Sequence, residues 1–318
     1  MQIPPEVLRC VAFLCPDDRA DPDGTAFFVA ITEDDPHPTG KVTGLYAVTA
    51  KHLLADYRSE GSESAWLRIN TRSGSTRMVH TQIKDWRQHS HSDVAIHPWP
   101  LDDTDLDILA FPARTFLIDD IVRIFSIGPG SDVFITGLFS QHFGTHTNIP
   151  VVRIGNIAAM RGQPIETEKH EPLDAYLIEV RSLGGLSGSP VFVYVDEIHD
   201  IEESEVGSNL RRSRAFYLLG SIYGHYHRDI RQIDREERWL NSGIAIVVPA
   251  ECILELLLVP EEIAVRERNN EEEKQRNAKM TPAVAKQKFI TDDEFQDALR
   301  RVSRRHSCPA SDQESKGT

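Results

Sequence analysis

A series of short apolar segments, each bounded by Gly, Pro, Asp or Ser, runs through the first 250 residues of the chain. Most of them are rich in β-branched or aromatic residues and none shows a helical repeat, so they are predicted to be β-strands. The first group comprises Val7–Leu14, Thr25–Ile31, Leu45–Thr49, Trp66–Ile69, Met78–Ile83, Asp93–Ile96 and Leu106–Phe111. The second group comprises Ile121–Ser126, Val133–Thr136, Val151–Ile157, Ala175–Val180, Val191–Val195, Phe216–Ile222 and Ile244–Val248. Two groups of six or seven strands predict two β-barrels side by side, joined near Pro112–Asp120.

The C-terminal part of the chain has a different composition and is predicted to be helical. A helix with an apolar face is expected over Glu251–Val259, followed by a charged, exposed helix or linker over Pro260–Met280. Ile290–Arg305 carries a capping threonine, leading acids and trailing arginines, which also predict a helix. The polar stretch Asp196–Arg214, between two strands, is expected to be a solvated loop. The expected units are an N-terminal barrel over 1–112, a second barrel over 113–259, and a charged helical extension with a flexible tail over 260–318.

Composition excludes several classes of protein. The chain has 318 residues and a formal net charge of −14, so it lacks the basic surface that general nucleic-acid binding requires. No stretch of about 18 apolar residues is present, so we expect no membrane-spanning helix. The cysteines at positions 10, 15, 252 and 308 are too few and too scattered for a disulfide framework, and the first 17 residues lack a secretory signal. These features predict a soluble, cytoplasmic protein.

Three short segments carry residues suited to hydrolysis, in the order His, Asp, Ser. They are Y-A-V-T-A-K-H-L-L with His52, S-D-V-A-I with Asp93, and G-G-L-S-G-S-P-V-F with Ser187. The chain resembles the trypsin-like (chymotrypsin-fold) serine peptidases of the bacterial, disulfide-free kind, which show T-A-x-H, D-[VI]-A and G-x-S-G-[GS]-P in this order. Flanking stretches extend the similarity over about residues 5 to 259: Gly24–Val29, Leu219–Ile222 and Ser242–Pro249. The resemblance implies an all-β fold of two packed six-stranded antiparallel β-barrels, here with a C-terminal helical extension.

The chemistry of these residues follows from elementary principles. A serine hydroxyl is a weak nucleophile near neutral pH and needs an imidazole as base, and the imidazole needs a carboxylate to fix its tautomer. Ser187 is therefore the candidate nucleophile, His52 the general base and then acid, and Asp93 the residue that orients His52. Asp107, also at the start of an apolar strand, stays open as the alternative carboxylate. The amides of Gly185 and Ser187 are expected to form the oxyanion hole, because glycine has access to backbone angles that other residues avoid.

One departure from the family concerns activation. Leu186 stands where many secreted members have an aspartate that pairs with a freshly cut N-terminus, and the chain lacks an I-V-G-G-like start. Activation by N-terminal cleavage is therefore not expected. The thirteen histidines occur without an H-E-x-x-H or C-x-x-C motif, so neither a metal site nor another cofactor is expected.

The substrate pocket is less clearly marked. The resemblance implies a pocket for the residue before the scissile bond, and counting back from Ser187 puts Arg181 and Ser182 at the family's pocket base, where an arginine would favour an acidic side chain. The alternative is that Arg181 ends a strand and faces solvent. Further substrate-binding candidates follow the cleft-lining strand: Tyr223, Gly224 and His225.

Two functions remain open from the sequence. The first is a serine endopeptidase that cleaves protein or peptide substrates through an acyl-enzyme. The second is a protease-fold binding or sensor module with little or no turnover, whose extension recruits a regulatory partner through 260–305.

Overall fold

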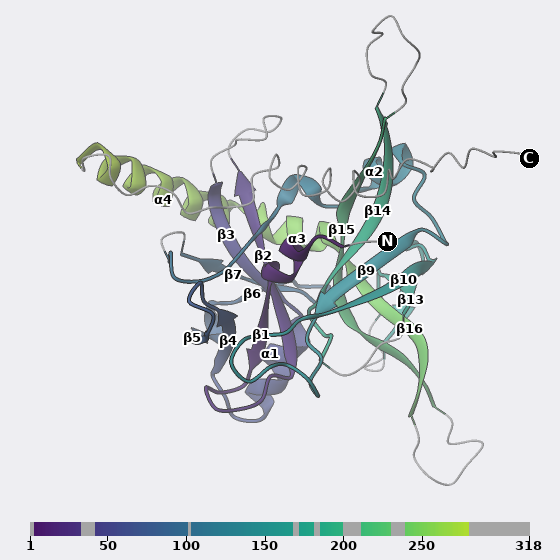
Figure 1. Cartoon of the computed structure of the whole chain (residues 1–318), viewed down its shortest axis with the longest axis horizontal. Coiled ribbons are helices and arrows are strands. Elements are labelled where there is room, and N and C mark those ends of the chain that lie inside the picture. The colour runs from purple at the N-terminus through teal and green to yellow at the C-terminus, as the bar shows by residue number, and fades with distance from the viewer. Residues whose placement is uncertain are drawn as a thin grey trace, which may run out of the picture.

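The computed structural model describes residues 3–32, 42–100, 103–167, 172–180, 185–199, 211–229 and 239–279. Over these residues the chain forms two large β-sheets that lie side by side, with short helices around them and one long helix that leaves the N-terminal sheet (Figure 1). The N-terminal sheet is an open half-barrel, and the C-terminal sheet is a closed barrel of six antiparallel strands. This is a mainly β architecture of two packed sheets, as expected from the sequence.

The N-terminal sheet has eight strands in the order β5-β4-β1-β2-β3-β7-β6, with β8 paired to β2. Its strands are β1 (Val11–Cys15), β2 (Gly24–Thr32), β3 (Val42–Thr49), β4 (Ser64–Asn70), β5 (Thr76–Gln82), β6 (Arg87–Gln88), β7 (Ala95–Trp99) and β8 (Phe111–Pro112). It differs from the closed six-stranded barrel expected here, because its edge strands β5 and β6 are not paired to each other. The short 3-10 helix η2 (Ile83–Asp85) leads from β5 to β6, and β6 has two residues, too few to close a barrel.

The C-terminal barrel has the strand order β10-β13-β16-β15-β14-β9 and confirms the second expected barrel. Its strands are β9 (Asp132–Gly137), β10 (Val151–Ala159), β13 (Tyr176–Glu179), β14 (Pro190–His199), β15 (Arg211–Asp229) and β16 (Trp239–Pro249). A separate pair, β11 (Ile165–Glu166) and β12 (Pro172–Leu173), forms a two-stranded sheet. The expected loop over Asp196–Arg214 is in part a β-ribbon, because β14 and β15 stay paired from Asp196↔Arg214 to His199↔Arg211. This ribbon and the β15–β16 ribbon project from opposite ends of the barrel (Figure 1).

Two strand predictions were wrong, and a third was right only for its second half. Ile121–Ser126 lies mostly in the helix α2 (Asp119–Ile124), whose first turn has two acids and whose last turn has a basic residue, the charge pattern that favours a helix. The segment Val7–Leu14 begins in the 3-10 helix η1 (Pro5–Cys10), where Pro5 fixes the backbone, and becomes a strand only at Val11. Of Leu106–Phe111, only the last residue belongs to a strand.

Successive residues of the central strands serve two different cores. On β2, Phe27 and Val29 face a cluster shared with the C-terminal barrel, whereas Phe28 and Ala30 face the interior of the half-barrel. The shared cluster also contains Phe134, Phe192, Phe216 and Val248 of the C-terminal barrel. Because both faces of β2 are buried, its sequence is apolar throughout rather than alternating. The shared core fixes the two sheets against each other.

Two helices follow the barrel. The expected helix over Glu251–Val259 is α3 (Ala250–Leu257), which buries Ile253 and Leu257 in the shared core. The long helix α4 (Pro260–Lys279) was expected to be exposed, but its first turns dock on the N-terminal sheet, where Arg87 of β6 donates to Glu262. Arg266 is buried and donates hydrogen bonds to the Tyr46 hydroxyl at 3.0 Å and the Leu257 carbonyl at 2.7 Å.

No helix among the described residues has the length and apolar character needed to cross a membrane. The helix expected over Ile290–Arg305 lies outside the described residues.

Candidate active site

His52 is placed by the turn between β3 and α1 (Lys51–Ser59). Ala50, at the N-cap of α1, offers no side chain to the first helical amides, and the carboxylate of Asp93 takes that place. Oδ1 of Asp93 accepts from the backbone N–H of His52 at 2.8 Å, and Oδ2 lies 2.6 Å from Nδ1 of the imidazole. An ionised carboxylate only accepts, so Nδ1 is the protonated nitrogen and Nε2 is the acceptor of the neutral ring.

Asp93 lies just before β7 and is 6% exposed, which protects its bonds to His52 from water. The segment that carries it is tied to the N-terminus of α1, because Nζ of Lys51 donates to the carbonyl of His89 at 3.0 Å. Asp107, the alternative carboxylate, lies elsewhere and accepts from Nε of Arg9 at 2.8 Å. The structure therefore pairs His52 with Asp93 and not with Asp107.

Ser187 lies in a turn whose two flanking glycines have left-handed backbone angles, φ +97° at Gly185 and φ +79° at Gly188. Its hydroxyl donates to the carbonyl of Tyr223 at 3.2 Å, and the Tyr223 ring lies 5.4 Å from the His52 ring. Tyr223 thus adjoins both residues. In the described part of the chain no hydrogen bond joins Ser187 directly to His52.

Thr25 of β2 ties the Ser187 turn to the N-terminal sheet. Its backbone N–H donates to the carbonyl of Ser187 at 2.9 Å, and its hydroxyl donates to the carbonyl of Gly185 at 3.1 Å. The same hydroxyl accepts from the N–H of Leu138 at 3.0 Å. Sequence reasoning did not single out Thr25 for this role, because a contact across 160 residues leaves no local signal.

The glycine at 188 is required by the close approach of two segments of the chain. A Cβ there would lie 2.1 Å from the Thr25 carbonyl oxygen and 2.7 Å from Oγ1 of Thr49, at a positive φ. Gly188→Ala is therefore expected to lower the free energy of unfolding by about 3 kcal/mol, measured by urea denaturation. Gly74 is the matched control: its φ is +82° with nothing within 4 Å, so Gly74→Ala is expected to cost only about 1 kcal/mol. Equal losses in the two variants would contradict the packing argument.

The candidate substrate-pocket residues are only partly described. Arg181 and Ser182 lie outside the described residues. Tyr223, Gly224 and His225 lie on β15 beside the Ser187 turn and are half-buried, at a point where the pairing with β16 shifts register between Ile222 and Gly224.

Leu186, the residue before Ser187, is 2% exposed and packs in the C-terminal barrel core through an apolar contact.

The described thiols are poor alternatives to the serine. Burial raises the pKa of Cys15 to about 12, and it also raises the pKa values of Cys10 and Cys252. Because the thiolate is the reactive form, the raised pKa values lower the reactivity of these three groups near neutral pH. All three are free cysteines.

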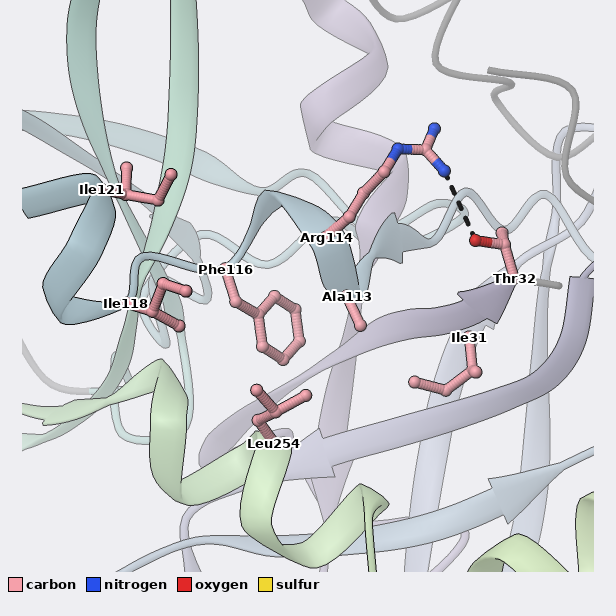
Figure 2. A pocket seen from close by; sticks show the side chains of 8 residues that line it. All are labelled: Ile31, Thr32, Ala113, Arg114, Phe116, Ile118, Ile121 and Leu254. Carbon is pink, nitrogen blue, oxygen red and sulfur yellow. Dashed lines mark hydrogen bonds between the residues drawn. The ribbon is translucent and has the colours of Figure 1, made fainter. Parts of the chain in front are cut away.

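The remaining features are not part of this site. Among the described residues no group of three or more potential ligands could hold a metal ion. A pocket of about 320 Å³ lies between the end of β2, the 3-10 helix η3 (Ala113–Thr115), α2 and α3, with Arg114 beside Thr32 at its rim (Figure 2). None of His52, Asp93 and Ser187 lines it.

Three solved structures are similar to most of this chain. The MamO protease domain from Magnetospirillum magneticum, in its apo form, is 14% identical with a TM-score of 0.47, over 81% of this chain and 100% of that chain. Deg5 is 12% identical with a TM-score of 0.44, over 80% of this chain and 91% of that chain. A serine-to-alanine mutant of Rv3671c from M. tuberculosis H37Rv, in an inactive form, is 15% identical with a TM-score of 0.39, over 80% of this chain and 89% of that chain. No protein-family model and no curated protein matches the chain.

Proposed function

We propose that this protein is a serine endopeptidase that cleaves protein or peptide substrates through an acyl-enzyme. The observation that carries the proposal is the pair of hydrogen bonds from His52 to Asp93, one of them 2.6 Å long at Nδ1, in a site where Tyr223 adjoins both His52 and Ser187. A surface histidine needs no buried carboxylate, whereas a catalytic base needs one to fix its tautomer.

The proposed reaction begins when the Ser187 hydroxyl turns from the Tyr223 carbonyl towards Nε2 of His52. The bond that it leaves is a neutral one at 3.2 Å, and such a bond contributes only about 1 kcal/mol. His52 takes the hydroxyl proton as the serine oxygen attacks the substrate carbonyl carbon. Asp93 stabilises the imidazolium that results without taking the proton itself.

The tetrahedral intermediate then collapses. The amides of Gly185 and Ser187 are proposed to donate to its oxyanion, and a donor of this kind is worth about 3 kcal/mol in the transition state. The scissile C–N bond breaks as His52 gives its proton to the leaving amine, which leaves an ester on Ser187. Water, activated by His52, hydrolyses that ester and restores the serine.

The test of the proposal is labelling by a fluorophosphonate probe, which forms a covalent phosphonyl ester with an activated serine. We expect a single adduct, mapped to Ser187 by peptide mass spectrometry. Heat-unfolded protein is the control and should not be labelled. Absence of the adduct from folded protein, or its presence on another serine, would be incompatible with the proposed nucleophile.

One observation favours the alternative, a binding or sensor module. The Ser187 hydroxyl donates to the carbonyl of Tyr223 and not to His52, so in this structure the serine is not hydrogen-bonded to its proposed base. In that function the extension from 260 to 305 would recruit the partner, and folded protein would take no label. The enzyme remains the better-supported function because His52, the proposed base, is hydrogen-bonded to the carboxylate of Asp93.

We propose that the protein is cytoplasmic, since the free thiols of Cys10, Cys15 and Cys252 would persist in that compartment.

A further inference from the structure

A buried arginine of the N-terminal sheet holds a loop of the C-terminal barrel. Arg68 lies on β4 and is 8% exposed. Its Nη1 donates to Oδ1 of Asn148 at 2.6 Å, and its Nη2 donates to the carbonyls of Gly144 and Thr145 at 2.9 and 3.0 Å. Within the described residues no carboxylate lies at ion-pair distance from the guanidinium, so all three acceptors are neutral groups of this one loop.

Asn148 completes the attachment from the side of the loop. It is 5% exposed, and its backbone N–H donates to Oδ1 of Asn70 at 2.6 Å. Its Nδ2 donates to the carbonyl of Arg68 at 2.6 Å, and its own carbonyl accepts from Nδ2 of Asn70 at 3.2 Å. Every polar group of Asn148 is thus paired with β4, which fixes the position and the orientation of the loop at this point.

The other end of the same loop packs against the Ser187 turn. The loop leaves β9 at Leu138, whose N–H donates to the Thr25 hydroxyl that in turn donates to the Gly185 carbonyl. A Cβ at Gly185 would lie 2.9 Å from Cγ of Leu138 and 3.3 Å from the backbone nitrogen of Ser140. The loop therefore supports the segment that would carry the oxyanion amides.

We propose that Arg68 is a positioning residue, which holds Gly185–Ser187 in a catalytically competent conformation by anchoring the loop from Leu138 to Ile149. This inference rests on the proposed function. A cation buried among neutral groups is costly to desolvate, so an arginine at this position is better explained by the geometry that its planar fork imposes than by stability. Leu186 makes an apolar contact within the barrel core, so no ion pair of that residue orders the segment.

The experiment compares Arg68→Met with Arg77→Met. Arg77 is also an arginine of the N-terminal sheet, on β5, but it pairs with Asp103 and Asp105 and makes no hydrogen bond to the loop. We expect Arg68→Met to lower kcat on a fluorogenic peptide by about 10- to 100-fold with KM changed by less than about twofold, because about 1 Å of misplacement at a reacting centre has that effect. The rate of fluorophosphonate labelling should fall by the same factor. Arg77→Met should leave both rates unchanged.

Hydrogen exchange supplies a readout that does not depend on activity. Arg68→Met should speed exchange of the amides of the 138–149 loop and of the Ser187 turn, and Arg77→Met should not. If the loop exchanges faster while kcat and labelling stay at the wild-type values, the loop does not position the site and the proposal is overturned. Unchanged exchange in both segments would overturn it as well. If wild-type protein takes no label at all, the proposed function fails, and the exchange result alone decides whether Arg68 orders the Ser187 turn.

Asn70→Ala keeps the proposal testable if Arg68→Met does not fold. Asn70 is half-buried at the end of β4, and its removal deletes two of the bonds to Asn148 while the Arg68 fork remains. We expect the same pattern with a smaller effect, about three- to tenfold in kcat and in labelling rate. No change in either rate, together with faster exchange of the loop, would count against the proposal in the same way.

Discussion

Ser187→Ala is expected to lower kcat for peptide hydrolysis by about 10⁶-fold and to abolish fluorophosphonate labelling. The variant removes the oxygen that would form the acyl-enzyme, and burial raises the pKa values of Cys10, Cys15 and Cys252, which disfavours the thiolate that could replace it. The fold should persist, since among the described residues the hydroxyl that is lost makes one hydrogen bond, to the carbonyl of Tyr223. The measurement is the initial rate on a casein-derived fluorogenic peptide, followed over hours so that a loss in kcat of this size can be detected.

Ser189→Ala is the matched control for this variant. Ser189 lies two residues away, is completely buried, and its hydroxyl has no hydrogen-bond partner among the described residues. Its removal should leave kcat within about twofold of wild type, because deletion of an unpaired buried hydroxyl is close to neutral. Undiminished hydrolysis by Ser187→Ala would mean that the nucleophile is another residue. A large loss of kcat in Ser189→Ala would mean that disturbance of the turn, and not loss of the Ser187 hydroxyl, lowers the rate.

Asp93→Asn has the second largest expected effect, a loss of about 10⁴-fold in kcat. The carboxylate accepts from both the backbone N–H and Nδ1 of His52. An asparagine oxygen can satisfy one of these donors, and its NH₂ group then faces the other position. If that position is Nδ1, the imidazole must carry its proton on Nε2, and it can no longer accept the proton of Ser187.

Asp107→Asn separates the two carboxylates that the sequence left open. Asp107 pairs with Arg9, which is partly exposed, so its loss should change stability by less than about 1 kcal/mol and kcat by less than about twofold. Parallel initial-rate measurements on both variants decide the matter. A deficit in Asp107→Asn comparable to that of Asp93→Asn would contradict the pairing at His52.

Most barrel strands could be predicted from the sequence because their apolar runs are short and clearly bounded. Strands β9, β10, β14 and β16 all include the segments expected for them. The segment at Ile121 failed because its apolar residues look like a strand, while the acids that start the helix precede it. The open N-terminal sheet could not be foreseen, since closure depends on pairing between β5 and β6 that no local pattern encodes.

The candidate site could also be predicted only in part from the sequence. His52, Asp93 and Ser187 each stand in a recognisable motif, and the first two lie in contact 41 residues apart in the chain. Arg68 and Asn148 are 80 residues apart, and neither stands in a motif, because an arginine in an apolar strand and an asparagine in a loop are ordinary residues. Their importance appears only when the two sheets are brought together. Supporting residues of this kind follow from packing and not from spacing.

The aromatic cluster between the two sheets also determines how the protein comes apart. Phe134, Phe192 and Phe216 are almost completely buried, and their cluster includes Phe27 and Tyr46 of the other sheet. Either sheet alone would expose this face to water, and a face of that kind promotes aggregation. Neither half is therefore an autonomous folding unit, and heat or urea should disrupt both in a single cooperative transition.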